Sequence, residues 1–205
     1  LVSLGNGEGS TAAVTVSVPS SIAIKTVTVN APATITVASG ATLAFSNAGG
    51  DVLVANANCQ IDGAGALTFS MSGSSGTDYA NIKPAAGTTL TLAARIAASG
   101  NSGLELNSAG TLLLTHSGNA FTGLARISTA NGTLAFSTPG ALGLNAVGLD
   151  GSPSKLSFAG TSAATLSLPL QITAGSATVE NAGAGPLTLA GAVTTASTGT
   201  TSAAR

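Results

Sequence analysis

Hydrophobic and polar residues alternate along much of the chain with a period of two. Each alternating run places its apolar side chains on one face of a short β-strand, and clusters rich in Gly, Asn and Ser separate the runs. The alanine-rich stretch 90–98 begins with the same alternation and lies between Gly87 and Gly100, so we expect a strand and a turn there. The pattern predicts an all-β protein; clear apolar pairs are Val14 and Val16, Ile35 and Val37, Leu43 and Phe45, and Val52 and Val54.

A repeat of about 22 residues organises these strands. A Gly, one or two small residues and a Leu recur along the chain, and a second series of mostly aliphatic residues recurs at nearly the same interval. Two series with one period indicate stacked coils, each holding two or three strands. The sequence therefore predicts a parallel β-helix, or β-solenoid, of about nine rungs of roughly 22 residues. The first series is Leu43, Leu67, Leu90, Leu112, Leu134 and Leu156; the second is Ile61, Ile82, Leu104, Ala125, Leu149 and Leu170.

Residues 1–193 are expected to form one solenoid domain. Its first 37 residues lack the Gly and Leu signature, so residues 1–37 are predicted to be an N-terminal cap or a segment that pairs with a neighbour. Residues 194–205 are poor in bulky side chains and are predicted to be a flexible or partner-pairing tail. The chain starts at Leu1 without a basic and apolar leader, which indicates a processed chain or an excerpt of a larger one.

Charged residues follow the second series in five of its six coils, and their signs alternate. Opposite charges on neighbouring coils attract whereas equal charges repel, so the series predicts a salt-bridge ladder that specifies the register of the coils. Exposed pairs of this kind contribute only about 0 to 1 kcal/mol each, so the ladder favours specificity over stability. The predicted ladder consists of Asp62, Lys83, Glu105, Arg126 and Asp150.

Composition excludes several classes of protein. Six basic residues are scattered singly and the net charge is −1, so the chain has no cationic face for nucleic acid. Every long apolar stretch is interrupted by Ser, Thr, Gly or Asn, which argues against a transmembrane helix. Because Cys59 is the only cysteine, no internal disulfide can form. The 205 residues are 44% hydrophobic and only 6% charged, which predicts a folded chain.

One segment resembles a known family of repeats. Residues 110–136 contain a Gly-Thr-Leu strand, a Gly-x-Asn-x-aromatic-x-Gly turn and a second Gly-Thr-Leu. This pattern resembles the autotransporter-associated beta strand repeat, also called the passenger-associated transport repeat. The resemblance implies a bacterial surface or secreted protein with a right-handed parallel β-helix, acting as a passenger stalk or extracellular scaffold. The matching residues are Gly110, Thr111, Leu112, Gly118, Asn119, Phe121, Gly123, Gly132, Thr133 and Leu134.

Candidate chemistry is sparse. The acidic residues do not cluster within any strand, and sugar-binding sites usually need aromatic platforms that one Tyr and five Phe do not supply. His116 has no second His or Cys at ligand spacing, and Cys59 lies too far along the chain to form a nucleophilic pair with it. The single Asn47–Asp51 loop and the Asn131-Gly132-Thr133 sequon are expected to be turns. We expect no catalytic, metal-binding or cofactor-binding residues.

The sequence thus predicts a non-enzymatic, extracellular or cell-surface structural protein. In one hypothesis it is an autotransporter-type passenger scaffold or adhesin, with a surface glycan or a host protein as partner. In another it is the protomer of an extracellular filament whose solenoid ends self-associate head to tail. A carbohydrate-active β-helix enzyme is the third hypothesis, and it would need a clustered acidic face.

Overall fold

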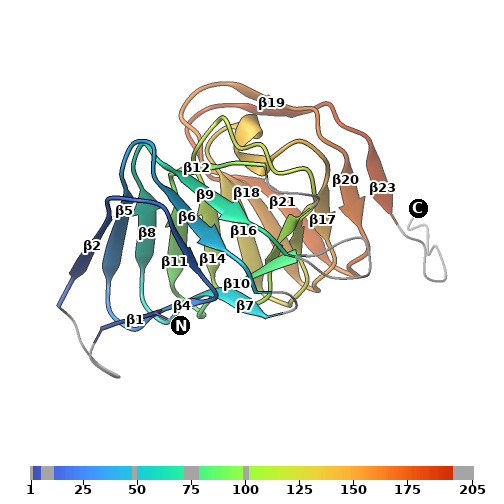
Figure 1. The fold of residues 1–205 in the computed structure, drawn as a ribbon. Coiled ribbons are helices and arrows are strands. Elements are labelled where there is room, and N and C mark those ends of the chain that lie inside the picture. The colour runs from blue at the N-terminus through green and yellow to red at the C-terminus, as the bar shows by residue number, and fades with distance from the viewer. Residues whose placement is uncertain (1, 6–11, 48–49, 72–78, 99–101, 196–205) are drawn as a thin grey trace, which may run out of the picture.

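The computed structural model describes residues 2–5, 12–47, 50–71, 79–98 and 102–195. The chain winds into a coil, and strands of successive turns lie side by side and pair in parallel (Figure 1). The predicted parallel β-solenoid is confirmed, with about eight turns of roughly 23 residues in place of nine shorter ones.

Sheet A forms one face of the solenoid and receives one strand from each successive turn. A continuous inward row runs from Val27 through Leu53 and Ile82 to Ile172, and its members pair from turn to turn. Most of this row is buried, which explains the period-two pattern of the sequence. The strands are β1 (Val2–Leu4), β4 (Val27–Val29), β7 (Asp51–Ala55), β10 (Tyr79–Pro84), β13 (Gly103–Leu106), β15 (Ala125–Ile127), β17 (Val147–Leu149), β20 (Leu170–Ile172) and β23 (Val193–Thr195).

Sheet B forms the second face, with eight strands. Its inward positions stack like on like: Leu90, Leu112, Leu134 and Leu156 follow one another in register and are buried. Its outward positions are mostly Thr and Ser. The strands are β2 (Val14–Val18), β5 (Ala33–Val37), β8 (Cys59–Asp62), β11 (Thr89–Leu92), β14 (Thr111–Leu114), β16 (Gly132–Phe136), β18 (Ser154–Phe158) and β21 (Ala177–Asn181).

The third face is divided between two smaller sheets. Sheet C holds the early turns and sheet D the late ones. Among the described residues, the turns between them carry no strand on this face, and one contains the 3₁₀ helix η1 (Pro139–Leu142). Sheet C consists of β3 (Ile22–Ile24), β6 (Thr42–Phe45), β9 (Ala66–Phe69) and β12 (Arg95–Ile96), and sheet D of β19 (Ala164–Leu166) and β22 (Leu187–Leu189).

Asn119 connects the turns where strand pairing on the third face stops. Its side chain is 3% exposed. The peptide N–H of Ile96 in β12 donates to Asn119 Oδ1 at 2.8 Å, and Asn119 Nδ2 donates to the carbonyl of Ala141 in η1 at 2.9 Å. One amide therefore replaces the two hydrogen bonds that a strand would make to the turns on either side.

Aromatic side chains also stack inside the solenoid. Phe45 and Phe69 lie in register on sheet C with ring centroids 5.2 Å apart, and Phe136 and Phe158 do the same on sheet B at 5.3 Å. All four are buried. Small and branched aliphatic side chains fill most of the narrow interior. It accommodates phenylalanine because equal rings on adjacent turns pack against each other, stacked in the Phe45–Phe69 pair and tilted by 48° in the Phe136–Phe158 pair.

The turns vary in length, which corrects the alignment of the two repeat series. On sheet B, the number of residues from one paired position to the next is small between Val14 and Ala33. It is much larger between Cys59 and Leu90. It is constant only in the later stretch that begins at Leu90 and ends at Leu156. The first series therefore changes sheet: its two earliest leucines lie on sheet C and the later four on sheet B. The second series mixes sheets A and B in the same way.

Both ends of the predicted domain contain paired strands. Strands β1, β2 and β3, all within residues 1–37, pair with β4, β5 and β6, so this stretch supplies solenoid turns. A capping or neighbour-pairing role for these end turns stays a prediction. The predicted tail begins inside β23, since Thr194 and Thr195 pair with β20. Residues 196–205 lie outside the described part of the chain. The strand expected at 90–98 is confirmed by β11, but a bend and a second short strand, β12, follow it in place of a turn.

The two loops that were expected to be turns differ in outcome. Asn131 lies in a turn and has a φ of +64°, but Gly132 and Thr133 already belong to β16. In the loop 47–51, the Gly50 N–H donates to the carbonyl of Asn47, which is typical of a turn. Residues 48 and 49 of that loop lie outside the described ranges.

We expect the substitution Asn119→Leu to lower the free energy of unfolding by at least about 2 kcal/mol, because it leaves one buried donor and one buried acceptor without partners. Chemical denaturation monitored by circular dichroism would measure the loss. The matched control is Asn145→Ala, which removes one exposed hydrogen bond to the carbonyl of Thr122 and should cost less than about 1 kcal/mol. Equal losses in the two variants would contradict the bridging role.

Candidate functional site

A charged cluster lies on the outer face of sheet A. Glu105 on β13 and Arg126 on β15 stand directly opposite each other on adjacent strands, and Arg126 Nη2 donates to Glu105 Oε2 at 2.9 Å. Arg126 Nη1 lies 4.0 Å from Asp150 Oδ2 of the next turn. The guanidinium also covers the ring of Tyr79, 3.9 Å from its centroid. Two carboxylates and an aromatic face therefore surround one cation.

The backbone leaves room for this arrangement. Gly148 pairs with Arg126 in register, and a Cβ at Gly148 would lie only 3.0 Å from the Cβ of Arg126. The missing side chain lets the guanidinium extend across β17 toward Asp150. Glu105 is only 8% exposed. The direct ion pair with Arg126 offsets the cost of burying this carboxylate.

Two members of the predicted ladder lie elsewhere. Asp62 is on β8 of sheet B, where its carboxylate accepts hydrogen bonds from Thr36 Oγ1 and Gln60 Nε2. Lys83 is on β10 of sheet A but forms its ion pair with Asp51 of the preceding turn, at 3.0 Å. The prediction was wrong at these two residues because the turns around them are longer than the predicted repeat, which moves the series from one sheet to another.

A further ion pair joins Lys155 and Glu180 on the outer face of sheet B, at 3.2 Å. The Ser157 hydroxyl also donates to Glu180 Oε1 at 2.9 Å. The Ser157 hydrogen bond, together with Lys155, lowers the pKa of the Glu180 carboxyl below its usual value. The sequence reasoning missed this pair because its partners occupy different outward rows on adjacent turns.

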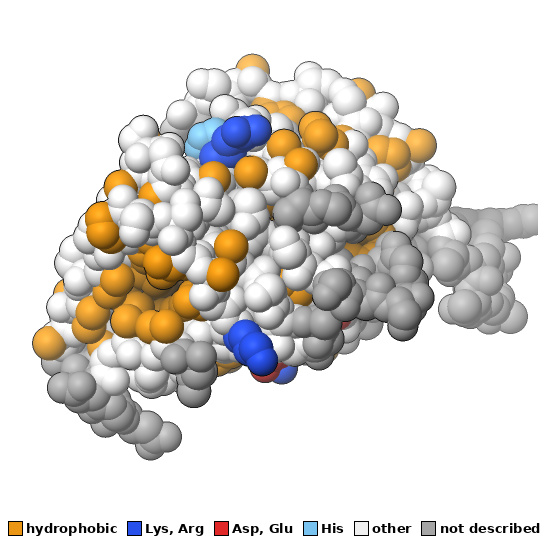
Figure 2. Space-filling model, viewed as in Figure 1, with side chains coloured by type: hydrophobic (Ala, Val, Ile, Leu, Met, Phe, Trp, Pro, Cys, Tyr) orange, Lys and Arg blue, Asp and Glu red, His pale blue; other side chains and the backbone are white. Residues whose placement is uncertain are grey.

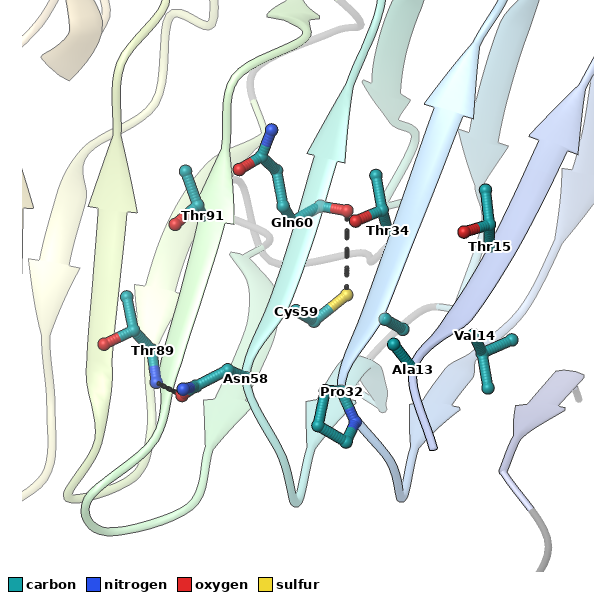
Figure 3. A pocket seen from close by; sticks show the side chains of 11 residues that line it. Ala13, Val14, Thr15, Pro32, Thr34, Asn58, Cys59, Gln60, Thr89 and Thr91 are labelled. Carbon is teal, nitrogen blue, oxygen red and sulfur yellow. Dashed lines mark hydrogen bonds between the residues drawn. The ribbon is translucent and has the colours of Figure 1, made fainter. Parts of the chain in front are cut away.

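Threonine side chains line the other end of the outer face of sheet B. Thr15, Thr34, Gln60 and Thr91 form one outward row across β2, β5, β8 and β11, as Figure 3 shows. A shallow hollow of about 340 Å³ opens where these strands begin. The Asn58 side chain accepts a hydrogen bond from the Thr89 backbone N–H at 2.8 Å there. The sequence shows threonine at alternate positions. Only the pairing of the strands shows that these residues line up from turn to turn.

Cys59 lies at the bottom of this hollow and is only 4% exposed. Burial raises the pKa of its thiol from 9.0 to about 11, so the thiol is protonated and a poor nucleophile at neutral pH. His116 follows β14 in the turn between sheet B and the third face, and its Nδ1 accepts a hydrogen bond from the Gly118 N–H. Cys59 and His116 line different hollows, so the structure does not bring them together.

The residues that carry the family resemblance fall within two turns. Leu112 and Leu134 are neighbours in the inward row of sheet B, and Phe121 is buried beside Gly143. Gly123 packs against backbone: a Cβ there would lie 2.3 Å from the nitrogen of Gly103. The motif therefore specifies a turn with a bonded asparagine, a buried aromatic ring and a close backbone approach.

Comparison of the chain with protein-family models, with curated proteins and with solved structures gave no match in any of the three. Within the described ranges, no three His, Cys, Asp or Glu side chains gather closely enough to hold a metal ion. No helix in those ranges has the length and hydropathy needed to cross a membrane.

We expect Glu105→Gln to destabilise the protein by about 1 to 3 kcal/mol, because Arg126 loses its closest anionic partner at a half-buried position. The control is Glu180→Gln, whose ion pair is more exposed and should contribute less than about 1 kcal/mol. Urea unfolding of both variants provides the comparison. A larger loss for Glu180→Gln would refute the greater contribution of the Arg126 pair.

We expect the buried thiol to make stability depend on alkaline pH. The folded pKa of Cys59 is about 11 and its ordinary value is 9.0, so the unfolded chain loses the proton first. The contribution is fully present below pH 9 and is lost as the pH rises to about 11. Between pH 8 and 10.5, the unfolding free energy of the parent chain should fall by about 1 to 2 kcal/mol more than that of Cys59→Ala. Parallel pH curves for the two proteins would contradict the assignment.

Proposed function

We propose that the chain is a non-enzymatic extracellular scaffold, a segment of a bacterial surface solenoid of the autotransporter passenger type. The observation that carries the proposal is the unbroken stacking of turns: sheets A and B run through the described solenoid with a parallel strand in nearly every turn. Such a stack acts as a spacer, because each added turn extends it by about 4.8 Å at little further cost. The repeat resemblance of residues 110–136 supports the bacterial surface assignment.

The carboxylates support a structural role. Each acidic side chain in the described ranges has a partner: four form ion pairs with Lys83, Arg126 or Lys155, and the fifth, Asp62, accepts hydrogen bonds from neighbouring side chains. Glycoside hydrolysis needs one carboxyl to donate a proton and a second to act as nucleophile or base. Carboxylates neutralised by permanent partners are poorly suited to either task.

A filament protomer is the second candidate, and the two end turns favour it. Val2 and Ile22 are 38% and 42% exposed at one end, and Leu189 and Val193 are 44% and 53% exposed at the other. The outer edges of the terminal strands are unpaired within the described residues. A second copy placed in register would cover these side chains and extend all three faces.

Inserting one extra turn tests the scaffold. A second copy of residues 111–132 repeats the step by which Thr111 pairs with Thr133 on sheet B, so the variant should fold cooperatively. Small-angle scattering should show a particle longer by about 4.8 Å. Fused ahead of an outer-membrane barrel, the parent and the lengthened chain should both be cleaved by protease added to intact cells, which would place them at the surface.

The matched control inserts residues 111–121 alone. This half turn would move every later strand to a different face, and we expect it to abolish folding. A lengthened chain that misfolds like the control would sink the scaffold proposal. Electron microscopy over a dilution series separates the second candidate, since long narrow fibres would favour the filament protomer and short monodisperse rods the scaffold.

A further inference from the structure

A small hollow lies at the corner where sheet B meets sheet C. It encloses about 260 Å³ and is lined by the turns after β5 and β8, by the first residues of β6 and β9, and by Arg95 and His116. This is slightly below the usual range for drug-sized ligands, about 300 to 1,000 Å³, so it suits a smaller molecule. Figure 2 shows a histidine beside a basic side chain on the visible surface, with no acidic side chain next to them.

Bare backbone forms the floor of the hollow. Gly63 has a φ of +105°, and a Cβ at this residue would lie 2.2 Å from the carbonyl oxygen of Val37. A Cβ at Gly65 would lie 2.4 Å from the carbonyl oxygen of Ala38. Side chains are therefore sterically excluded at both positions. The turns pack too closely for any residue other than glycine at these two positions. No side chain therefore rises from the floor, which leaves it accessible to a ligand.

Arg95 forms one wall and carries a charge that no acidic side chain in the described ranges neutralises. It stands next to Ala66 in the register of sheet C, and Ala66 stands next to Thr42, so only small side chains lie beside it. Its Nε donates to the carbonyl of Gly118 at 3.2 Å, which orients the guanidinium. In the described part of the chain, Lys83, Arg126 and Lys155 form ion pairs and Arg95 forms none.

His116 forms the adjoining wall with a defined donor. Its Nδ1 accepts a hydrogen bond from the Gly118 N–H at 3.0 Å, so the proton of the neutral ring is on Nε2. Gly118 thus orients both side chains, by its carbonyl for Arg95 and its N–H for His116. Asp62 precedes Gly63 in the chain, but its carboxylate is bonded to side chains on sheet B and does not line the hollow.

We propose that this corner hollow binds a small oxyanion, a carboxylate or sulfate of the size carried by a single acidic sugar. The terminal nitrogens of Arg95 supply the planar donor pair that matches a carboxylate or sulfate edge, and His116 Nε2 supplies a third donor. Thr42 adds a hydroxyl at the same hollow. The site does not depend on the proposed function, since it rests on this corner alone.

Titration of the isotope-labelled chain with sodium sulfate, glucuronate and glucose tests the proposal by nuclear magnetic resonance. Sulfate or glucuronate should shift the amide signals of Gly40, Gly63 and Gly65, and neutral glucose should not. Tighter binding of glucuronate than of sulfate would assign the site to acidic sugars, and the reverse order to inorganic anions. Affinity should fall with added sodium chloride, because the attraction is electrostatic.

Three variants make the test specific. Arg95→Gln should weaken binding by about tenfold or more. The glutamine amide can still donate a hydrogen bond, but it lacks the positive charge that strengthens hydrogen bonds to an anion. His116→Asn keeps an acceptor for the Gly118 N–H but removes the Nε2 donor, and it should weaken binding severalfold. The control is Lys25→Gln, which removes an exposed cation outside the hollow and should leave the affinity unchanged.

Two results would overturn the site. One is the absence of shifts at the corner glycines with both anions in the folded parent chain. The other is an equal loss of affinity in Lys25→Gln and Arg95→Gln, which would reveal unspecific attraction to any exposed cation. Arg95→Lys covers the case in which Arg95→Gln fails to fold: it keeps the charge, loses the planar fork, and should still bind more weakly than the parent.

Discussion

Parallel backbone pairing between successive turns is the constraint on which the rest of the molecule depends. Each turn offers its peptide groups to the next at about 4.8 Å, so a residue in an inner strand of a sheet has a partner on the turn before and on the turn after. Equal side chains on adjacent turns must therefore be able to pack against each other. Leucine stacks on leucine from Leu90 to Leu156, and phenylalanine on phenylalanine at two places in the interior. Charge obeys the opposite rule, since equal charges repel at this spacing: Glu105 faces Arg126, and the long side chain of Arg126 reaches Asp150.

The same constraint explains why the fold could be predicted from the sequence but the charged cluster only in part. Period-two alternation and a recurring Gly and Leu are local features, and they indicated a parallel solenoid correctly. Residue counting located Glu105, Arg126 and Asp150 together because the step near them is close to the predicted repeat. It failed at Asp62 and Lys83, since the turns around these two residues are longer than the repeat and no local pattern in the sequence marks their additional residues. Tyr79 was missed for the same reason.

The corner hollow illustrates a different limit. Its floor is made by glycines, which allow the backbone of the neighbouring turn to pack closely against them. Its walls come from two later turns. Arg95 and His116 are not neighbours in the sequence, but the backbone of Gly118 orients both. Its carbonyl accepts a hydrogen bond from Arg95, and its N–H donates one to His116. A lone histidine and an isolated arginine carry no pattern in the sequence. Their relation appears only when the turns are stacked, because the step from one turn to the next brings them to the same corner.

The division of the third face has a mechanical consequence. Two faces of the rod carry long sheets, whereas the third face is interrupted between β12 and β19, where the bonds of Asn119 and the short helix η1 stand in for strands. A beam with two reinforced sides and one interrupted side has unequal bending stiffness. Under lateral load this solenoid would flex most readily in the direction that opens the third face at Asn119, and resist bending toward the other two. Residues 110–136, which carry the resemblance to the repeat family, lie within this interrupted section.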